Sequence, residues 1–377
     1  MTIYIHERQG WPQFEWTSQS VTGYLAAVRY QQGRLSGRME ALGSELRAEA
    51  ISQTLTEDVV TSGALDGDTL DRESVLAAVS RCLADHGALK PEKALLTSAG
   101  SSRAGSVWPF IDAAGHCQAP VTLERLFGWH AALLPDGTSN GILVAVGTLR
   151  EGPVRTGMQY VGSARRARGH LYAPEAAQLR IEIVRFLEWF NSDAPLDPVL
   201  KAAIAHLWFL ALQPFEAGNG GLARVLSDLM LARAEGGRPR FYSLSAQLCR
   251  EHKAYALALE RARKASLDIT PWLQWFFACL TGAFASAEDL LAHILRKARF
   301  REALPRQDLS VRQRFVIEHL LEHSGGTLAV SDWATLANTS KDTALRDIND
   351  LLARGLLLKK DAGGRSSRYR LPALKLD

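Results

Sequence analysis

The feature that most constrains the fold is the apolar run AAIAHLWFLAL at 202–212. It has no polar face, which is typical of a helix buried on all sides, and it is shorter than the ~20 residues that span a bilayer. Gln213-Pro214 ends it, because a residue before proline is pushed out of the α region. After the loop Gly-Asn-Gly-Gly at 218–221, apolar residues spaced i, i+3, i+4, i+7 predict a second helix. The chain is therefore expected to build a buried helical pair, 199–212 and 222–235.

The composition and the positions of glycine and proline residues predict a mainly α protein of several domains. The chain has 377 residues, of which 47% are hydrophobic and 22% charged, which is a globular composition. The periodicity predicts a helical N-terminal module over 1–90 with a turn at Asp66-Gly67, a larger helical core over 91–300 and a C-terminal unit over 301–377. Within the core, the β-branched and glycine-rich segment 142–172 predicts a small β-hairpin or extended flap.

Cysteines and termini argue for a soluble cytoplasmic protein. The four cysteines are scattered without CxxC or metal-ligand spacing, so we expect reduced thiols and no bound metal. The N-terminal sequence MTIYIHERQG carries charge where a signal peptide needs an apolar core. No membrane partner is expected.

The C-terminal unit is predicted to contain three short helices followed by a basic hairpin. The third helix, KDTALRDINDLLARG, has Ser340 as N-cap and Gly355 as its C′ residue. Leu345, Ile348 and Leu352 are expected on its inner face. From Lys341 to Asp377 there are nine Lys/Arg and five Asp, so 9 − 5 = +4, which equals the formal net charge of the whole chain.

This layout resembles a winged helix-turn-helix, in which a helix enters the major groove and a basic wing contacts phosphates. The resemblance implies duplex DNA as partner. The candidate DNA-binding residues are Lys341, Thr343, Arg346, Lys359, Lys360, Arg365 and Arg368. Docking of a protein or dimerisation remains the alternative, since Asp342, Asp347 and Asp350 on the third helix oppose DNA binding.

The glycine loop is a candidate anion site. Gly218, Asn219 and Gly220 allow positive φ and close approach, and the N–H groups of the next helix point into the loop. These residues and Arg224 are the candidate phosphate-binding or nucleotide-binding set. A plain helix connection is the simpler alternative, and so is an i, i+4 pair of Arg224 with Asp228.

The loop sequence QPFEAGNGGLAR resembles the motif of the Fic family, His-x-Phe-x-(Asp/Glu)-Gly-Asn-Gly-Arg-x-x-Arg. AHLWFLALQPF before it is similar to the core helix of that family, and GMQYVGSARRARGHLYAPEAAQLRIEIVRFLEWFN is similar to its target-docking flap and following helix. WPQFEW…GRLSGRMEALGSELRAEA and the C-terminal DTALRDINDLLARG are similar to the modules of one Fic subgroup. The resemblance implies a Fic-type helical core and transfer of AMP from ATP to a protein hydroxyl.

Three motif positions depart from that pattern. The catalytic His position holds Gln213, and an amide cannot accept a proton near neutral pH. The acidic Mg²⁺ ligand position holds Ala217, whose methyl cannot bind a metal. The first arginine position holds Gly221. No catalytic residue is therefore predicted, and no cofactor is expected.

The segment SGALDG resembles the inhibitory helix of many Fic proteins, in which a Glu pairs with the second motif arginine. Ser62, Asp66 and Gly67 occupy its positions, with an acid one methylene shorter. Asp66 could reach Arg224, and a turn formed by Asp-Gly is the slightly favoured alternative.

The sequence therefore predicts a catalytically silent Fic-fold protein that binds DNA or a protein partner, with a homodimer left open. A protein target could dock on the flap 150–170. The competing hypothesis is an enzyme with altered chemistry, using ATP or Mg²⁺ and a substitute base such as Glu216 or His170.

Overall fold

The structure, a computed structural model, describes residues 3–84, 104–152, 154, 173–303, 309–322, 327–360 and 367–372. These residues form two compact units, Met1–Glu288 and Asp289–Asp377. The division lies inside a long helix, whereas the sequence predicts a boundary at 300/301. The predicted boundary at residue 90 falls outside the described residues.

The first unit is almost entirely helical. Its elements are η1 (Ile5–Glu7), α1 (Ser18–Glu40), α2 (Ser44–Leu65), α3 (Arg72–Ala84), η2 (Ala104–Val107), α5 (Trp108–Gly115), α6 (Leu123–Leu133), β1 (Thr138–Ser139), β2 (Ile142–Leu143), α7 (Ala176–Asn191), α8 (Pro198–Leu212), α9 (Asn219–Ala234), α10 (Leu244–Arg250), α11 (His252–Lys264) and the first part of α12 (Thr270–Ala303). The mainly α class predicted from the sequence is confirmed.

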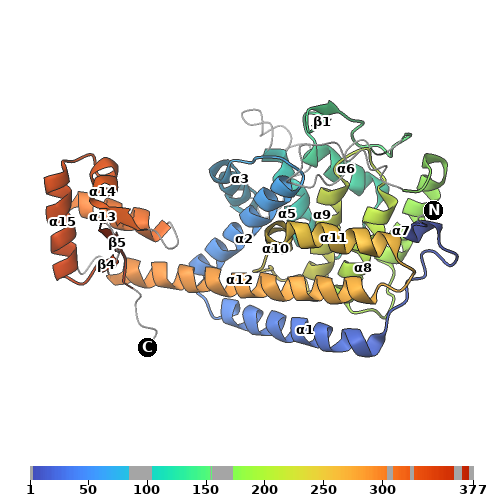
Figure 1. Cartoon of the computed structure of the whole chain (residues 1–377), viewed down its shortest axis with the longest axis horizontal. Helices are drawn as coiled ribbons and strands as arrows, with labels where there is room; N and C mark the ends of the chain where they lie inside the picture. Colours follow the sequence, from blue (N-terminus) through green and yellow to red (C-terminus); the bar gives the residue numbers. More distant parts are fainter. Residues whose placement is uncertain are drawn as a thin grey trace. The chain divides into compact units, whose positions relative to one another are not determined.

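The core of this unit is the helical pair α8–α9, which confirms the helices expected from the apolar run. Every residue of α8 from Val199 to Leu212 is buried. Helices α5 and α6 pack against α9, whereas α7 and α11 pack against α8, so that the pair is enclosed (Figure 1). Burial on all sides explains why α8 carries no polar face.

The N-terminal module consists of three separate helices, α1, α2 and α3. A break at Gly43 separates α1 from α2. Helix α2 packs against α3 and α10 and also contacts α9. It ends at Leu65, and Gly67 follows with φ +90°, so the predicted turn at Asp66-Gly67 is confirmed. This turn lies beside the glycine loop of α9.

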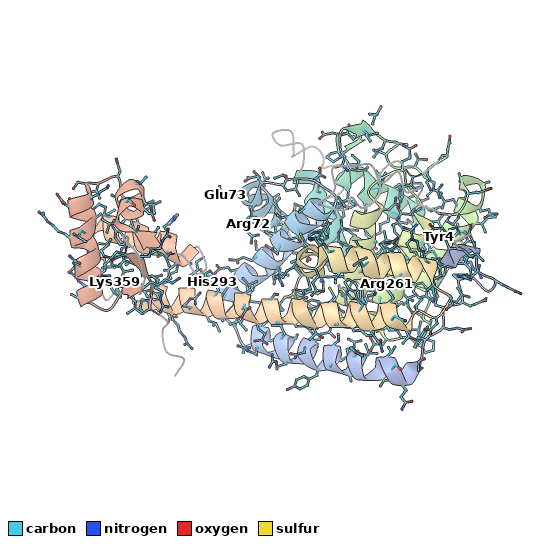
Figure 2. The ribbon with its side chains drawn as sticks, viewed as in Figure 1. Tyr4, Arg72, Glu73, Arg261, His293 and Lys359 are labelled. Atoms are coloured by element: carbon cyan, nitrogen blue, oxygen red, sulfur yellow. The ribbon has the colours of Figure 1, made fainter. Side chains whose placement is uncertain are left out.

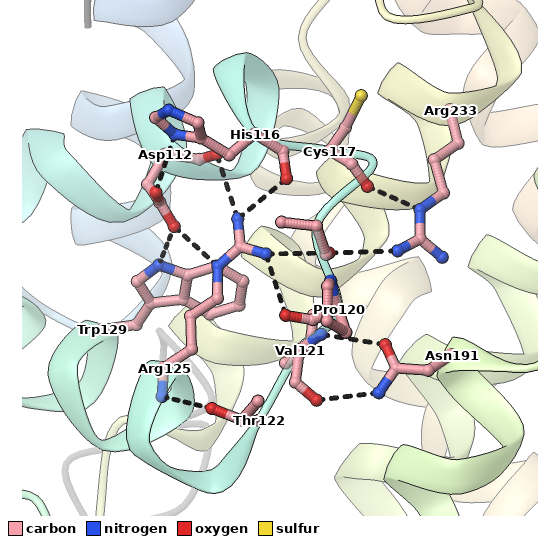
Figure 3. A network of polar contacts seen from close by, with 11 residues as sticks. Asp112, His116, Cys117, Pro120, Val121, Thr122, Arg125, Trp129, Asn191 and Arg233 are labelled. Carbon is pink, nitrogen blue, oxygen red and sulfur yellow. Dashed lines mark hydrogen bonds and ion pairs between the residues drawn. The ribbon is translucent and has the colours of Figure 1, made fainter. Parts of the chain in front are cut away.

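Two arginines fix the connection between α5 and α6 (Figure 3). Arg125 donates from Nε to Asp112 Oδ2 at 2.8 Å and from Nη1 to the Ala119 carbonyl at 3.0 Å. Arg233 of α9 donates from Nε to the Cys117 carbonyl at 2.6 Å. These charge-assisted hydrogen bonds tie α6 to α9. The position of α6 matters because its last turn reaches the glycine loop.

The described β-hairpin lies earlier than predicted. Strands β1 and β2 pair antiparallel through Asn140-Gly141, whose φ values of 50° and 75° fit the tight turn that this dipeptide favours. The sequence predicts a hairpin or extended flap over 142–172 from its β-branched and glycine residues, and the Asn-Gly dipeptide at 140–141 does not enter that prediction. Residues 153 and 155–172 of that prediction lie outside the described residues.

The second unit contains three helices and a three-stranded antiparallel sheet. Its elements are the end of α12, α13 (Val311–Glu322), β3 (Leu328–Ala329), α14 (Val330–Leu336), α15 (Lys341–Ala353), β4 (Leu358–Lys360) and β5 (Arg368–Arg370), with strand order β3-β5-β4. Trp333 and Ile348 lie in its core together with Phe300 of α12.

The inner face of α15 is rotated relative to the prediction. Ala344, Asp347, Ile348 and Leu351 are buried, whereas Leu345 is 42% exposed. The prediction treated Asp347 as a solvent-facing carboxylate, but Arg312 of α13 binds it and so allows its burial. The predicted caps are confirmed, since Ser340 Oγ accepts from Thr343 N at 3.2 Å and Gly355 has φ +70°.

Helix α12 is the one described helix long and apolar enough to cross a membrane, over Thr270–Glu302 with mean hydropathy 1.2. This is a matter of length and composition only, and the buried core helices of soluble proteins meet the same criterion.

Candidate functional site

The glycine loop begins at a left-handed residue. Gln213 ends α8 where the sequence predicts, but with φ 45° it is left-handed and not extended as residues before proline usually are. Its side-chain Nε2 donates to the Leu210 carbonyl at 2.9 Å, and the residue is 5% exposed. Arg150 donates from Nε to the Gln213 carbonyl at 2.7 Å. The amide at the position of the family's base is therefore turned back onto its own helix.

Asn219 holds the loop closed. Its Oδ1 accepts from Phe215 N at 3.0 Å, and its Nδ2 donates to the Phe215 carbonyl at 2.8 Å. Asn219 is 3% exposed, and its side chain is used in these two bonds. The sequence predicts Asn219 in the phosphate-binding set; the observed contacts give it a structural role in the loop.

His130 of α6 supports the other side of the loop. Its ring stacks on Phe215 with centroids 4.1 Å apart. Nδ1 accepts from Gly147 N at 3.1 Å, so Nε2 carries the proton and donates to the Ala217 carbonyl at 3.1 Å. Burial lowers the pKa of His130 to about 4, which keeps the ring neutral. Sequence reasoning missed His130 and Arg150, because both act on backbone atoms distant along the chain.

The Ala217 side chain lies in an apolar cluster with Leu134 and Val144. Adjacent Glu216 accepts from Ala145 N at 3.1 Å through Oε2. Among the residues described, no three His, Cys, Asp or Glu side chains gather into a metal-binding group. The methyl group of Ala217 supplies no oxygen ligand at this position, and Mg²⁺ requires oxygen ligands.

Arg224 is the most buried charge of the site, at 1% exposure. It donates from Nε to Ser62 Oγ at 2.8 Å and from Nη2 to the Ser62 carbonyl at 3.0 Å. Nη2 also binds Asp66 Oδ2 at 2.6 Å. The structure thus brings Arg224, at the second arginine position of the motif, together with Ser62 and Asp66 of the SGALDG segment. Asp228, the alternative partner for Arg224, pairs with Arg240 instead.

The carboxylate of Asp66 stands directly over the N-terminus of α9. A Cβ added at Gly220 would lie 2.8 Å from Asp66 Oδ1, and one added at Gly221 would lie 3.2 Å from Oδ2. Glycine at both positions therefore lets the carboxylate approach the helix N-terminus, where the free N–H groups and the helix dipole favour an anion. The chain supplies its own anion to this position.

Tyr255 and His206 lie behind Arg224. Burial raises the pKa of the Tyr255 hydroxyl, and the nearby charge of Arg224 acts in the opposite direction. Tyr255 OH lies 2.7 Å from His206 Nε2, and His206 Nδ1 lies 2.9 Å from Ser227 Oγ. Because Ser227 Oγ donates to the Ala223 carbonyl, it accepts from His206, whose pKa burial lowers to about 3. His206 of α8 is thus a core histidine whose two ring nitrogens both have hydrogen-bond partners.

A pocket with a volume of about 80 Å³ adjoins these groups. Ser62, Asp66, Gly220, Arg224 and Arg263 are among its lining residues. A buried water needs roughly 10–15 Å³ of such space. The pocket therefore has room for a few waters or one phosphate-sized anion, and a whole nucleotide would require displacement of the residues that line it.

The candidate DNA-binding residues are grouped on two elements of the second unit. Lys341 and Arg346 are exposed on α15, and Thr343 is half-buried beside the Ser340 cap. Lys359 (Figure 2), Lys360 and Arg368 are exposed on β4 and β5. Arg365, like His170 and most of the flap 150–170, lies outside the described residues.

Comparison with known proteins agrees with this fold and loop. Residues 120–231 match the Fic/DOC family, and residues 4–84 match a domain of unknown function, DUF4172. The chain therefore contains a Fic/DOC domain over residues 120–231.

Curated relatives carry the name protein adenylyltransferase Fic. That of Drosophila virilis is 31% identical over 172 residues, which are 45% of this chain and 30% of the relative. Protein adenylyltransferase fic-1 of Caenorhabditis briggsae is 33% identical over 86 residues, or 22% of this chain and 15% of the relative. The chain thus spans less than a third of the length of these Fic relatives.

A solved structure of a Fic family protein from Desulfovibrio desulfuricans covers 96% of this chain and 99% of its own, with TM-score 0.50 and 17% sequence identity. At that identity the similarity shows the fold.

Proposed function

We propose that this Fic protein acts by binding and does not transfer AMP. The observation that carries the proposal is the position of Asp66, whose carboxylate occupies the N-terminus of α9 and pairs with Arg224. Gln213 supports it, because its amide is hydrogen-bonded to Leu210 and has no protonation equilibrium near neutral pH. A general base alone typically contributes about 10²–10⁴-fold to such a rate.

The test is transfer of label from radiolabelled ATP, with Mg²⁺ or Mn²⁺, to the protein itself and to a mixture of candidate target proteins. No labelling above background is expected. Labelling that disappears in the Arg224→Ala variant would contradict the proposal and favour the enzyme. Calorimetric titration with ATP and ADP gives an independent answer, since tight binding of either nucleotide also favours the enzyme.

We further propose duplex DNA as the partner, bound by the second unit in the manner of a winged helix. The register of β4 and β5 supports this, because Lys360 and Arg368 stand directly opposite each other. Like charges in such a cross-strand pair are destabilising unless an anion lies between them. A phosphate backbone supplies that anion.

The acidic residues of α15 oppose DNA less than their number suggests. Asp347 is 8% exposed and is bound by Arg312 through Nε at 2.9 Å. Asp350 accepts from Gln313 Nε2 at 2.8 Å and from Arg354 Nε at 3.0 Å. Two of the three carboxylates are therefore turned to cations or amides of the same unit, which leaves Lys341 and Arg346 on the exposed face.

The experiment is binding of a fluorescent duplex at several salt concentrations. We expect an affinity that falls steeply with salt, with a slope of about −0.9 per phosphate contacted. Absence of retention on DNA at low salt would contradict DNA binding and leave docking of a protein as the better account of this surface.

A further inference from the structure

A second polar connection joins α2 to α9, one helical turn away from the contact between Ser62 and Arg224. Arg240, which follows α9, binds Asp58 Oδ2 of α2 at 3.2 Å and Asp228 Oδ1 of α9 at 2.9 Å. The three side chains are 5%, 0% and 2% exposed, respectively. The Arg240 guanidinium therefore lies between two carboxylates in the buried interface of α2 and α9.

The charges facing this group leave one negative charge without compensation. Glu57 and Arg224 also act on the two carboxylates, and Tyr242 and Glu235 lie beside Arg240. Burial raises the pKa of Tyr242 and of Glu235, which favours their neutral forms. Arg224 is paired with Asp66, and among the described residues Arg240 is the cation that forms ion pairs with the two aspartates. Two ionised carboxylates on one buried guanidinium are costly, since like charges at close range favour retention of a proton.

The hydrogen bonds identify the aspartate that keeps the proton. Burial raises the pKa of Asp58 as well, but Asp58 accepts from Ser243 Oγ at 2.5 Å and from the backbone of Ser245, and these hydrogen bonds favour its charged form. The Asp228 oxygens have no hydrogen bond in the described structure beyond the ion pair with Arg240. Desolvation raises the pKa of Asp228 to about 8. Asp228 is therefore the protonated member at neutral pH.

The geometry links this group to the candidate site. Asp58 lies one helical turn before Ser62 on α2, and Asp228 lies one turn after Arg224 on α9. The two connections are consecutive cross-links between the same pair of helices. Separation of α2 from α9 at one of them therefore also removes Asp66 from Gly220 and Arg224.

We propose that Asp58, Arg240 and Asp228 form a proton-dependent clamp on α2: the clamp holds one proton while it is closed and releases it when α2 leaves α9. Opening is thus favoured as the pH rises, and it uncovers Arg224 and the N-terminus of α9. The inference does not depend on whether the loop transfers AMP.

The direction in which pH changes the stability of the closed state follows from proton linkage. The closed state binds a proton that the opened, hydrated Asp228 gives up above its ordinary pKa of ~4. Closure is therefore most stable below pH ~4, weakens through the interval up to pH ~8, and changes little above that. Between these limits the opening constant should rise about tenfold for each pH unit.

Hydrogen–deuterium exchange of the full chain tests this. Protection factors for the amides of 54–66, corrected for the pH dependence of intrinsic exchange, should fall about tenfold per pH unit from pH 5 to 7 and level off near pH 8. In Asp228→Asn the profile should be flat, because an amide of the same shape carries no titrating proton. Asp136→Asn, on an exposed turn, should keep the wild-type profile. Wild-type protection that does not change with pH overturns the clamp.

Infrared spectroscopy provides a second measurement that does not rely on a single variant. The carbonyl band of a protonated carboxylic acid should be present at pH 6 and lost through pH ~8 in the wild type. Asp58→Asn should remove the same band, because it leaves one carboxylate for one guanidinium. Because burial also raises the pKa of Glu235, the relevant signal is the part of this band that differs between the wild type and each Asn variant at pH 6. Absence of such a difference in either variant overturns the proposal, even if the other variant fails to fold.

Discussion

The N-termini of α9 and α15 have the same backbone electrostatics but differ in the group that lies at the helix end. Each presents free N–H groups and the positive end of a helix dipole, which attract an anion. At α9 the Asp66 carboxylate lies at the helix end and pairs with the buried Arg224. At α15 the neutral Ser340 hydroxyl caps the helix, and the exposed Lys341 and Asp342 follow it in the first turn.

The difference shows what makes a helix N-terminus available to an outside ligand. Both sequences contain the features of an anion site, glycines in one case and a serine cap with basic neighbours in the other. What separates them is whether a distant segment brings a carboxylate to the helix end. Helix α2 does so for α9, because the turn at Gly67 directs Asp66 toward the glycines.

The largest effect is expected from Asp66→Ala, which would make the α9 terminus resemble that of α15. Loss of one member of a buried ion pair costs about 3–5 kcal/mol, and the lower end applies here because the Asp66 side chain is 33% exposed. Urea unfolding of the first unit should therefore shift by about 3 kcal/mol. Inorganic phosphate should recover part of that loss in the variant, because it can replace the carboxylate beside Arg224.

Asp136→Ala is the matched control, since this aspartate is exposed on a turn. It should change neither the unfolding transition nor the response to phosphate. If Asp66→Ala behaves like Asp136→Ala, the carboxylate contributes nothing to the α9 terminus and the comparison with α15 fails.

Much of this contrast was accessible from the sequence. The buried pair α8–α9 followed from an apolar run without a polar face, and the α15 caps followed from Ser340 and Gly355. The family motif identified the positions of Arg224 and Asp66, but spacing alone left a turn at Asp66 as the favoured alternative. The structure contains both the turn and the ion pair of Asp66 with Arg224. The pair also requires a close approach of α2 to α9, and that is a tertiary property.

Other contacts carried no sequence signal. Arg150 and His130 act on backbone carbonyls of the loop, and any residue type at the receiving end provides a carbonyl. The orientation of α15 was mispredicted because a buried Asp347 is stable only with Arg312 of another helix. Hydrophobic periodicity in the sequence indicates which apolar residues face inward. The burial of a charged residue such as Asp347 depends instead on a partner that is distant in the chain.

A smaller effect is expected from the double substitution Lys359→Ala and Lys360→Ala in β4. If both lysines contact phosphates, the negative slope of log affinity against log salt should become shallower by about 2. The folded stability of the second unit should stay nearly unchanged, because both side chains are exposed. Arg261→Ala, an exposed cation on α11 of the first unit (Figure 2), is the control and should leave the slope as it is. An unaltered slope in the double variant would remove β4 from the DNA-binding surface.

The smallest effect on stability, and the sharpest test of the comparison, is expected from Ser340→Asp. Aspartate is about as good an N-cap as serine, so the unfolding free energy of the second unit should change by less than ~0.5 kcal/mol. DNA affinity should nevertheless fall, because a carboxylate would then occupy the α15 terminus as Asp66 occupies that of α9. Ser340→Ala should show the opposite pattern, with a stability loss of about 1 kcal/mol and a smaller loss of affinity. Equal DNA binding by wild type and Ser340→Asp, measured at the same salt, would mean that the α15 terminus lies away from phosphate, and that filling a helix end with a carboxylate is not what separates the two regions.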